Sequence, residues 1–347
     1  MLWMRCAAAF RYTASMIESA TATPYQDLTP DVILAAVEST GRRSDGRLLA
    51  LNSYENRVYQ VGIEDGAPLI VKFYRPDRWS DAAILEEHAF SRELAGAEIP
   101  VVAPLADTGG QTLLHHAGYR YALFPRQGGR APDLERTEQL EWLGRFIGRI
   151  HALGAAGHFQ QRAQIDIETL GRVPREFMLQ SGFLPPELVA RYREVADLLL
   201  AGVARSFERA GDFPRIRLHG DCHPGNLLWT DAGPHFVDLD DCATGPAVQD
   251  LWMLLAGTRA DMQQQLDHVL EGYRRFADFN PAELWLIEAL RALRMLHYAA
   301  WVARRWSDPA FPRAFPWFNA PRYWEEHIQS LREQLAVLDE APLSLER

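Results

Sequence analysis

The sequence predicts an α+β fold in which a small β-rich lobe is followed by a larger helical lobe. Short runs rich in β-branched and aromatic residues are concentrated in residues 48–124, whereas apolar residues at helical spacing dominate beyond residue 130. A stretch containing Pro and Gly, residues 125–129, interrupts both patterns. With 347 residues, the chain is long enough for two lobes around a cleft.

The first lobe is predicted over residues 28–125. Thr29 followed by Pro30 is typical of the start of a helix, because Thr caps the first turn and Pro fits its geometry. A second helix is expected to begin at Ser80 and to run to about Ala95. The expected strands lie within residues 48–62, 69–74, 111–115 and 119–124.

The second lobe is predicted over residues 126–347. Leu143, Ile147 and Ile150 would share one face of a helix over residues 134–153. The Pro- and Trp-rich run 306–324 is interpreted as a non-helical segment that packs on this lobe or flanks the acceptor groove. Further helices are expected at 186–208, 250–256 and 281–306, and two short strands at 227–229 and 235–237.

Residues 1–27 are expected to form an unstructured extension, with Met16 as an alternative start of the protein. The formal net charge of -10 disfavours a broad nucleic-acid surface. Three scattered cysteines do not make a disulfide framework, and no apolar stretch is long enough to span a membrane. We therefore expect a monomer in the cytoplasm, bound neither to nucleic acid nor to a membrane.

The strongest chemical signal is the run His219-Gly220-Asp221, followed shortly by Asn226. This spacing lets Asp221 face an acceptor hydroxyl while the Asn226 amide oxygen reaches a metal ion. Asp238 follows across a short hairpin at the end of an apolar strand, where a carboxylate is well placed to hold Mg²⁺. The arrangement predicts an ATP- and Mg²⁺-dependent phosphotransferase with Asp221 and Asp238 as catalytic residues and Asn226 and Asp238 as metal ligands.

Lys72 lies in an apolar strand, where it is either an edge residue or a ligand of the ATP phosphates. The following helix offers Glu86 and Glu87 as partners, and we favour Glu87. The turn before residue 58 lacks the glycines of a protein-kinase phosphate loop, and Asn56 and Ser53 stand in two of their places. Ser53 is predicted to contact the nucleotide.

Other residues near this constellation are predicted to have roles outside phosphate and metal binding. Asp250 is predicted to hold the backbone of the catalytic loop, and residues 124–127 to form the hinge that contacts adenine. Cys222 would make the enzyme sensitive to alkylation only if its thiol is accessible. A zinc site built on His219, Cys222 and His223 is disfavoured, because no second pair of ligands is evident.

These motifs resemble the aminoglycoside phosphotransferase and choline kinase superfamily, through residues 218–226, 236–241 and 245–254. Residues 51–60, 71–76, 85–88 and 305–312 resemble more closely a bacterial Ser/Thr protein kinase of that superfamily. The resemblance runs from about residue 28 to the C-terminus. It implies a protein-kinase-like fold, a role in stress survival, and transfer to Ser or Thr of proteins, including this chain itself.

Two other functions remain open from the sequence. A small-molecule kinase acting on an amino alcohol, a sugar or an aminoglycoside would use the same catalytic residues. A nucleotide-binding adaptor without turnover would be expected to lack one of them, and Lys72, Asp221, Asn226 and Asp238 are all present.

Overall fold

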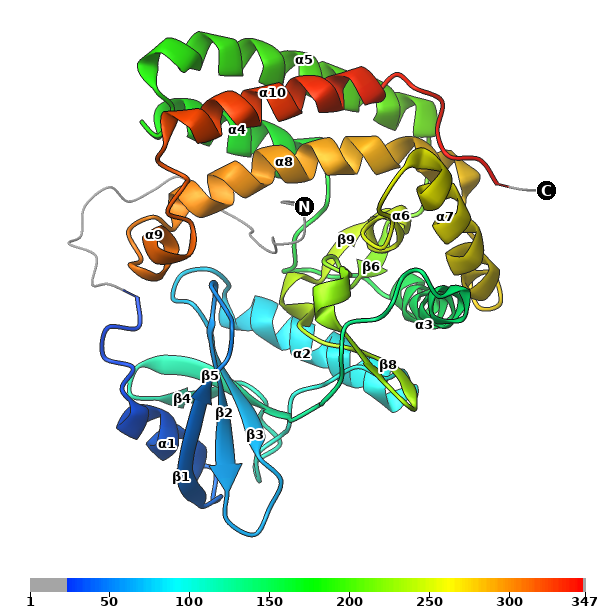
Figure 1. Ribbon diagram of the computed structural model, residues 1–347. Helices are drawn as coiled ribbons and strands as arrows, with labels where there is room; N and C mark the ends of the chain where they lie inside the picture. The colour runs from blue at the N-terminus through cyan, green and yellow to red at the C-terminus, as the bar shows by residue number, and fades with distance from the viewer. Residues whose placement is uncertain (1–23, 346–347) are drawn as a thin grey trace.

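The computed structural model describes residues 24–345. Their architecture is a small lobe built on an antiparallel sheet and a larger helical lobe, which confirms the predicted α+β class (Figure 1). The predicted division of the chain into lobes at residues 125 and 126 remains a prediction. Within the segment assigned to the extension, residues 24–27 form a turn, and the Tyr25 side chain is buried in the core of the small lobe, so the unstructured interpretation is wrong for these residues.

The small lobe is a five-stranded sheet in the order β1-β2-β3-β5-β4. Alternation along β3 places Val71 and Phe73 in the core with Ile33 and Tyr121, whereas Lys72 points to the opposite face, toward the other lobe. The elements are α1 (Pro30–Glu38), β1 (Ser44–Ala50), β2 (Arg57–Ile63), β3 (Leu69–Phe73), α2 (Asp81–Gly96), β4 (Leu114–His116) and β5 (Tyr119–Pro125).

Helices form most of the second lobe, and α8 runs through its centre. Most side chains of α8 are buried, because α4, α5, α6 and α10 all pack against it. The helices are α3 (Thr137–Ala155), α4 (Val173–Gln180), α5 (Val189–Ala210), α6 (Val248–Trp252), α7 (Arg259–Tyr273), α8 (Leu286–Arg304), α9 (Ala310–Ala314) and α10 (Pro321–Val337). Short helical turns are η1 (Glu168–Arg172), η2 (Pro186–Leu188), η3 (Pro224–Asn226), η4 (Leu239–Asp241) and η5 (Pro281–Trp285).

Two pairs of short strands carry the predicted chemistry. β7 (Leu227–Thr230) and β8 (Gly233–Phe236) form the hairpin between Asn226 and Asp238, as expected from the sequence. β6 (Ile216–Leu218) pairs with β9 (Ala243–Gly245), a pairing the sequence analysis missed. The two pairs hold residues 219–226 and 237–242 between them, so that the two motif-bearing loops lie side by side.

The helical lobe departs from prediction in several places. The segment 306–324 is not wholly non-helical, because it contains α9 and the first turn of α10. The helices α4 and α7 were not predicted, although Thr258 and Asp261 form a capping box at the start of α7. α6 ends at Trp252 and is shorter than expected. No helix among residues 24–345 is long and apolar enough to cross a membrane.

Candidate active site

A cavity of about 570 Å³ is lined by residues of both lobes. The small lobe contributes the turn around Ser53 together with Lys72 and Glu87, and the helical lobe contributes Asn226 and Asp238. Phe124, Pro125 and Gln127, from the segment predicted to contact adenine, line it as well. Trp301 and Phe315, from the helical lobe, also line it. The predicted site residues Ser53, Lys72, Glu87, Asn226 and Asp238 therefore line one cavity, and Asp221 lies beside it in contact with Asn226.

Asp221 is buried, and both oxygens of its carboxylate are engaged. Arg294 on α8 donates through Nη1 to Oδ1 at 2.9 Å. Asn226 Nδ2 and His223 Nε2 each lie 3.3 Å from Oδ2. Burial alone would raise the pKa of Asp221, but Arg294 and His223 outweigh it and hold the pKa well below its ordinary value. Asp221 is therefore an anion throughout the physiological range.

The His223 ring is oriented by the backbone of the same loop. The amide N–H of Gly225 donates to His223 Nδ1 at 2.9 Å, so in the neutral ring Nδ1 carries no proton. The proton of neutral His223 is then on Nε2, which faces the Asp221 carboxylate. This tautomer lets His223 donate to Asp221.

The predicted role of Asp250 agrees with its contacts. Its carboxylate accepts the backbone N–H groups of His219 at 2.9 Å and Gly220 at 2.8 Å. On the other side, Nε2 of the buried His151 lies 3.0 Å from Asp250 Oδ2. Asp250 thus fixes the backbone immediately before Asp221 without lining the cavity itself.

Lys72 has three carboxylate neighbours, and Glu87 is the most distant of them. Lys72 Nζ lies 2.9 Å from Asp238 Oδ1, 3.2 Å from Asp240 Oδ1 and 3.8 Å from Glu87 Oε1. Burial acts to lower the pKa of Lys72, but these anions outweigh it and raise the pKa well above its ordinary value. The Lys72 cation is therefore secured chiefly by Asp238 and Asp240, which the sequence analysis did not pair with it.

The positions of Glu86 and Glu87 are consistent with the preference for Glu87 as the partner of Lys72. Glu87 is buried against Lys72, and burial raises the pKa of Glu87 to about 7 because the distant Lys72 compensates it only partly. Glu86 points elsewhere and accepts the backbone N–H groups of Gln160 and Gln161, both at 2.7 Å. Glu86 therefore fixes a loop of the helical lobe.

The turn that carries Ser53 is held by its own hydrogen bonds. Ser53 Oγ donates to the carbonyl oxygen of Asn56 at 3.0 Å. The buried Asn56 side chain donates to Asp240 Oδ2 at 2.9 Å and accepts the N–H of Arg75 at 3.1 Å. Asn56 thus links the turn to the other lobe, whereas Ser53 stabilises the tip of the turn and lines the cavity.

A buried network of charges between the lobes was missed by sequence analysis. Glu55, beside Asn56, accepts the indole N–H of Trp301 at 2.7 Å and forms an ion pair with Arg305. Asp308 pairs with both Arg57 and Arg75. The segment 305–308 therefore contacts the nucleotide-side turn, and the resemblance of residues 305–312 was the signal that pointed to this segment.

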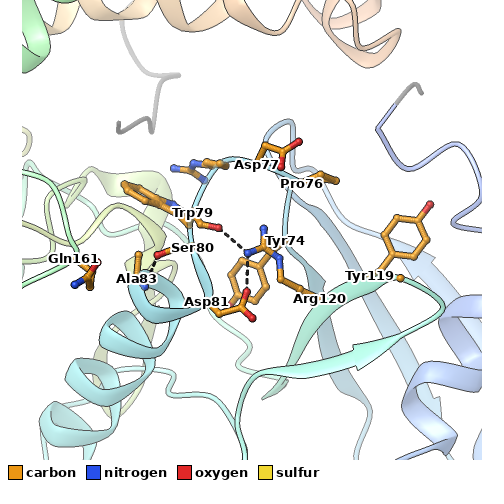
Figure 2. A pocket seen from close by; sticks show the side chains of 12 residues that line it. Tyr74, Pro76, Asp77, Trp79, Ser80, Asp81, Ala83, Tyr119, Arg120 and Gln161 are labelled. Atoms are coloured by element: carbon orange, nitrogen blue, oxygen red, sulfur yellow. Dashed lines mark hydrogen bonds and ion pairs between the residues drawn. The ribbon is translucent and has the colours of Figure 1, made fainter. Parts of the chain in front are cut away.

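A second cavity of about 560 Å³ lies beside the connection from β3 to α2 (Figure 2). Arg120 crosses it and donates to the Trp79 carbonyl at 2.6 Å and to Asp81 Oδ1 at 2.9 Å. Arg78 lines both cavities, and its guanidinium pairs with Asp240 and Asp241 beside the first. This connection is thereby fixed on one side by Arg120 and on the other by the loop that carries Asp238.

Cys222 is fully buried, and burial raises the pKa of its thiol well above the ordinary value. The condition for alkylation, an accessible thiolate, is therefore not met. A set of Glu141, His268 and Glu271 between α3 and α7 has side-chain atoms within 4.8 Å of one another, away from the predicted site. Glu141 and Glu271 already pair with Arg145 and Arg275, so this set fits a surface charge network.

The chain belongs to the phosphotransferase enzyme family, whose pattern it matches over residues 47–293. It is 46% identical over 325 residues to stress response kinase A of Escherichia coli, covering 94% of this chain and 98% of that protein. It is also 46% identical over 321 residues to the serine/threonine protein kinase RdoA of Salmonella typhimurium, covering 92% of this chain and 97% of that protein. The recognised family is thereby confirmed.

Solved structures of kinases share this fold. An amicoumacin kinase, solved in complex with AMP-PNP, Ca²⁺ and Ami, superposes with a TM-score of 0.66 at 18% identity, covering 87% of this chain and 91% of that one. A microcompartment-associated aminopropanol kinase gives a TM-score of 0.66 at 21% identity, covering 89% and 97%. Both act on small molecules, and at these identities the likeness concerns the fold alone.

Proposed function

We propose that this protein is an ATP- and Mg²⁺-dependent Ser/Thr protein kinase that acts in the bacterial stress response. The observation that carries the proposal is the 46% identity, over nearly the whole length of both chains, to proteins named stress response kinase A and serine/threonine protein kinase RdoA. The cytoplasm is its proposed location and the monomer its proposed state. The site geometry supports phosphoryl transfer in particular.

In this proposal Asp221 orients the acceptor hydroxyl. Its carboxylate is held by the loop and by Arg294, and it remains ionised, so it accepts a hydrogen bond from the incoming hydroxyl without waiting for deprotonation. The low pKa makes Asp221 a weak base, which suits a reaction in which positioning contributes more than proton abstraction. Lys72 binds the phosphates and Ser53 contributes to the turn that covers them.

Asn226 and Asp238 would hold the magnesium ion. The Nδ2 group of Asn226 donates to Asp221, which leaves its amide oxygen, the atom that a hard cation prefers, for a metal. The Asp238 side chain is half exposed, and both residues line the same cavity. The donor set therefore fits Mg²⁺, which would neutralise charge that develops on the transferred phosphoryl group.

The competing proposal is a small-molecule kinase. The amicoumacin and aminopropanol kinases favour it only through the shared fold. A non-catalytic adaptor is disfavoured, because Lys72, Asp221, Asn226 and Asp238 converge at one site.

The deciding experiment is phosphoamino-acid analysis after incubation with labelled ATP, with this chain alone and with generic acceptor proteins of acidic and basic composition. The Asp221→Asn variant is the blank. Phosphoserine or phosphothreonine above the blank supports the protein kinase. Its absence, together with efficient turnover of a small alcohol or amine, would support the alternative.

A further inference from the structure

One face of α8 runs along the site, from the catalytic loop to the nucleotide-side turn. Arg294, Tyr298, Trp301 and Arg305 follow one another at spacings of three and four residues, which places them on the same side of the helix. Arg294 contacts Asp221 at one end, and Trp301 and Arg305 contact Glu55 at the other. An acceptor that approaches Asp221 therefore does so beside this face.

Two partly exposed side chains, those of Arg294 and His223, lie against the buried carboxylate of Asp221. The Asp221 side chain is only 2% exposed, whereas those of Arg294 and His223 are 24% and 20% exposed. Each covers a different oxygen of the carboxylate. Both side chains lie against the carboxylate that an acceptor hydroxyl has to reach, and neither carries a negative charge.

Arg294 has binding capacity that Asp221 does not use. Its contact with Asp221 is made through Nη1, and a guanidinium carries five N–H donors in a planar fork. With 24% of the side chain exposed, the remaining donors of Arg294 are partly open to solvent beside Asp221. A fork of this kind matches a carboxylate better than any other common side-chain group.

The carboxylates that line the cavity offer little to a cationic acceptor. Among the described residues, each lies within 4 Å of a Lys or Arg side chain: Asp238, Asp240 and Glu87 near Lys72, Asp241 near Arg78, and Glu55 near Arg305. A polyamine or an amine-bearing small molecule would thus find no unpaired carboxylate among these cavity-lining residues.

The cavity wall at the Glu55 end of this helix face is aromatic. Tyr54 and Phe315 pack with ring centroids 5.2 Å apart, and Trp301 packs on Phe315 at 5.7 Å. All three line the cavity. This wall lies on the same face of α8 as Arg294 and offers an apolar surface to a peptide acceptor.

We infer, resting on the proposed protein-kinase function, that the acceptor is a Ser- or Thr-containing segment with a neighbouring Asp or Glu, and that Arg294 is the residue that selects it. Arg294 binds the acidic side chain of the acceptor while keeping its contact with Asp221. It disfavours acceptors whose neighbouring residues are Lys or Arg.

The test compares peptides that share one Ser and differ only in flanking residues: Asp and Glu, Asn and Gln, or Lys. They are assayed with wild type, Arg294→Gln, Arg294→Lys and the control Arg291→Gln, which removes an arginine one turn earlier that pairs with Glu288. We expect wild type to favour the acidic over the basic peptide by about tenfold or more in kcat/KM. Arg294→Gln should abolish this ratio by raising KM for the acidic peptide, with KM for ATP unchanged, whereas Arg294→Lys and Arg291→Gln should keep a preference.

Equal turnover of all peptides by wild type, or a preference for the basic one, would overturn the inference. It would also be overturned if Arg294→Gln lowered kcat for every peptide equally and left the ratio intact, because Arg294 would then only position Asp221. If Arg294→Gln does not fold, the wild-type enzyme alone tests the inference. Its ratio of kcat/KM for the acidic over the basic peptide should then decrease with added salt. Failure of wild type to phosphorylate any peptide or protein would count against the proposed function instead.

Discussion

The indole N–H of Trp301 donates to Glu55 Oε2 at 2.7 Å, and this bond joins the central helix of the large lobe to the turn next to Ser53 in the small lobe. Both residues are buried, so the bond forms where water cannot replace it. The placement of the nucleotide-side turn therefore depends on a residue far from it in the sequence.

Replacing Trp301 by Phe keeps most of the apolar volume and removes this donor. We expect the free energy of unfolding to fall by about 1–3 kcal/mol, because a buried charged acceptor loses a partner. We also expect a few-fold weaker binding of ATP, since the turn lines the cavity. Urea unfolding and nucleotide titration measure the two effects, and Trp142→Phe, at a Trp that is 38% exposed and does not line the cavity, is the control. If the free energy of unfolding and the ATP affinity of Trp301→Phe both equalled those of wild type, the bond would not position the turn.

Asp221→Asn should lower kcat by about 100-fold or more, because the amide cannot orient the acceptor hydroxyl as an anion does. ATP affinity should change by no more than a few-fold. Steady-state kinetics and ATP titration test both statements. Asp231→Asn, at an exposed hairpin position, is the matched control and should behave as wild type. Turnover within a few-fold of wild type in Asp221→Asn would remove Asp221 from the mechanism.

Asn226→Ala and Asp238→Ala should each weaken metal-dependent nucleotide binding, because each removes an oxygen ligand from the proposed Mg²⁺ site. The measurement is ATP affinity as a function of Mg²⁺ concentration. We expect the half-saturating Mg²⁺ concentration to rise by about tenfold or more in each variant, since an oxygen that binds the ion directly is lost. An unchanged magnesium requirement in both would contradict the assignment.

A variant of Glu283 can measure how much ionisation of a buried carboxyl lowers the free energy of unfolding. The Glu283 carboxylate accepts the N–H of Val248 at 2.9 Å at the start of α6, the helix that carries Asp250, and burial raises the pKa of Glu283 to about 7. Because the folded state holds the proton more tightly than the unfolded state, the contribution of Glu283 to stability falls as the pH rises from about 4.5 to about 7.

Glu283→Gln keeps an acceptor for the backbone and cannot ionise. Relative to wild type, we expect the variant to be unchanged near pH 4 and stabilised by up to about 3 kcal/mol at pH 8. Urea unfolding at the two pH values measures this. A stability difference that does not vary with pH would show that the carboxyl of Glu283 does not titrate in this range.

Gly144 lies on α3 at the point where α7 approaches closely. A Cβ at this position would lie 1.9 Å from the carbonyl oxygen of Val269, so the two helices cannot keep their separation. Gly144→Ala should lower the free energy of unfolding by about 1–3 kcal/mol or more. Gly96→Ala, where a Cβ meets nothing within 4 Å, should leave stability unchanged or raise it by less than about 1 kcal/mol. Equal behaviour of the two variants would contradict this packing.

The sequence by itself determined the fold class and the members of the site that lie in short motifs. A short run of β-branched and aromatic residues marked β3 and helical spacing marked α3, because both are local properties of the sequence. Asp221, Asn226 and Asp238 were recognisable because they lie in short motifs, and Asp250 because it begins the motif Asp250-Leu251-Trp252. The capping box at Thr258 was equally local and was overlooked.

Only the tertiary structure decided which charges meet. Lys72 lies closer to Asp238 and Asp240 than to the Glu87 that was predicted as its partner. Arg294 reaches Asp221 from α8, and Trp301 reaches Glu55 from the other lobe. Ion pairs and hydrogen bonds between residues distant in sequence depend on how the helices pack and on which side chains are removed from water together. No periodicity or spacing along the chain encodes those pairings.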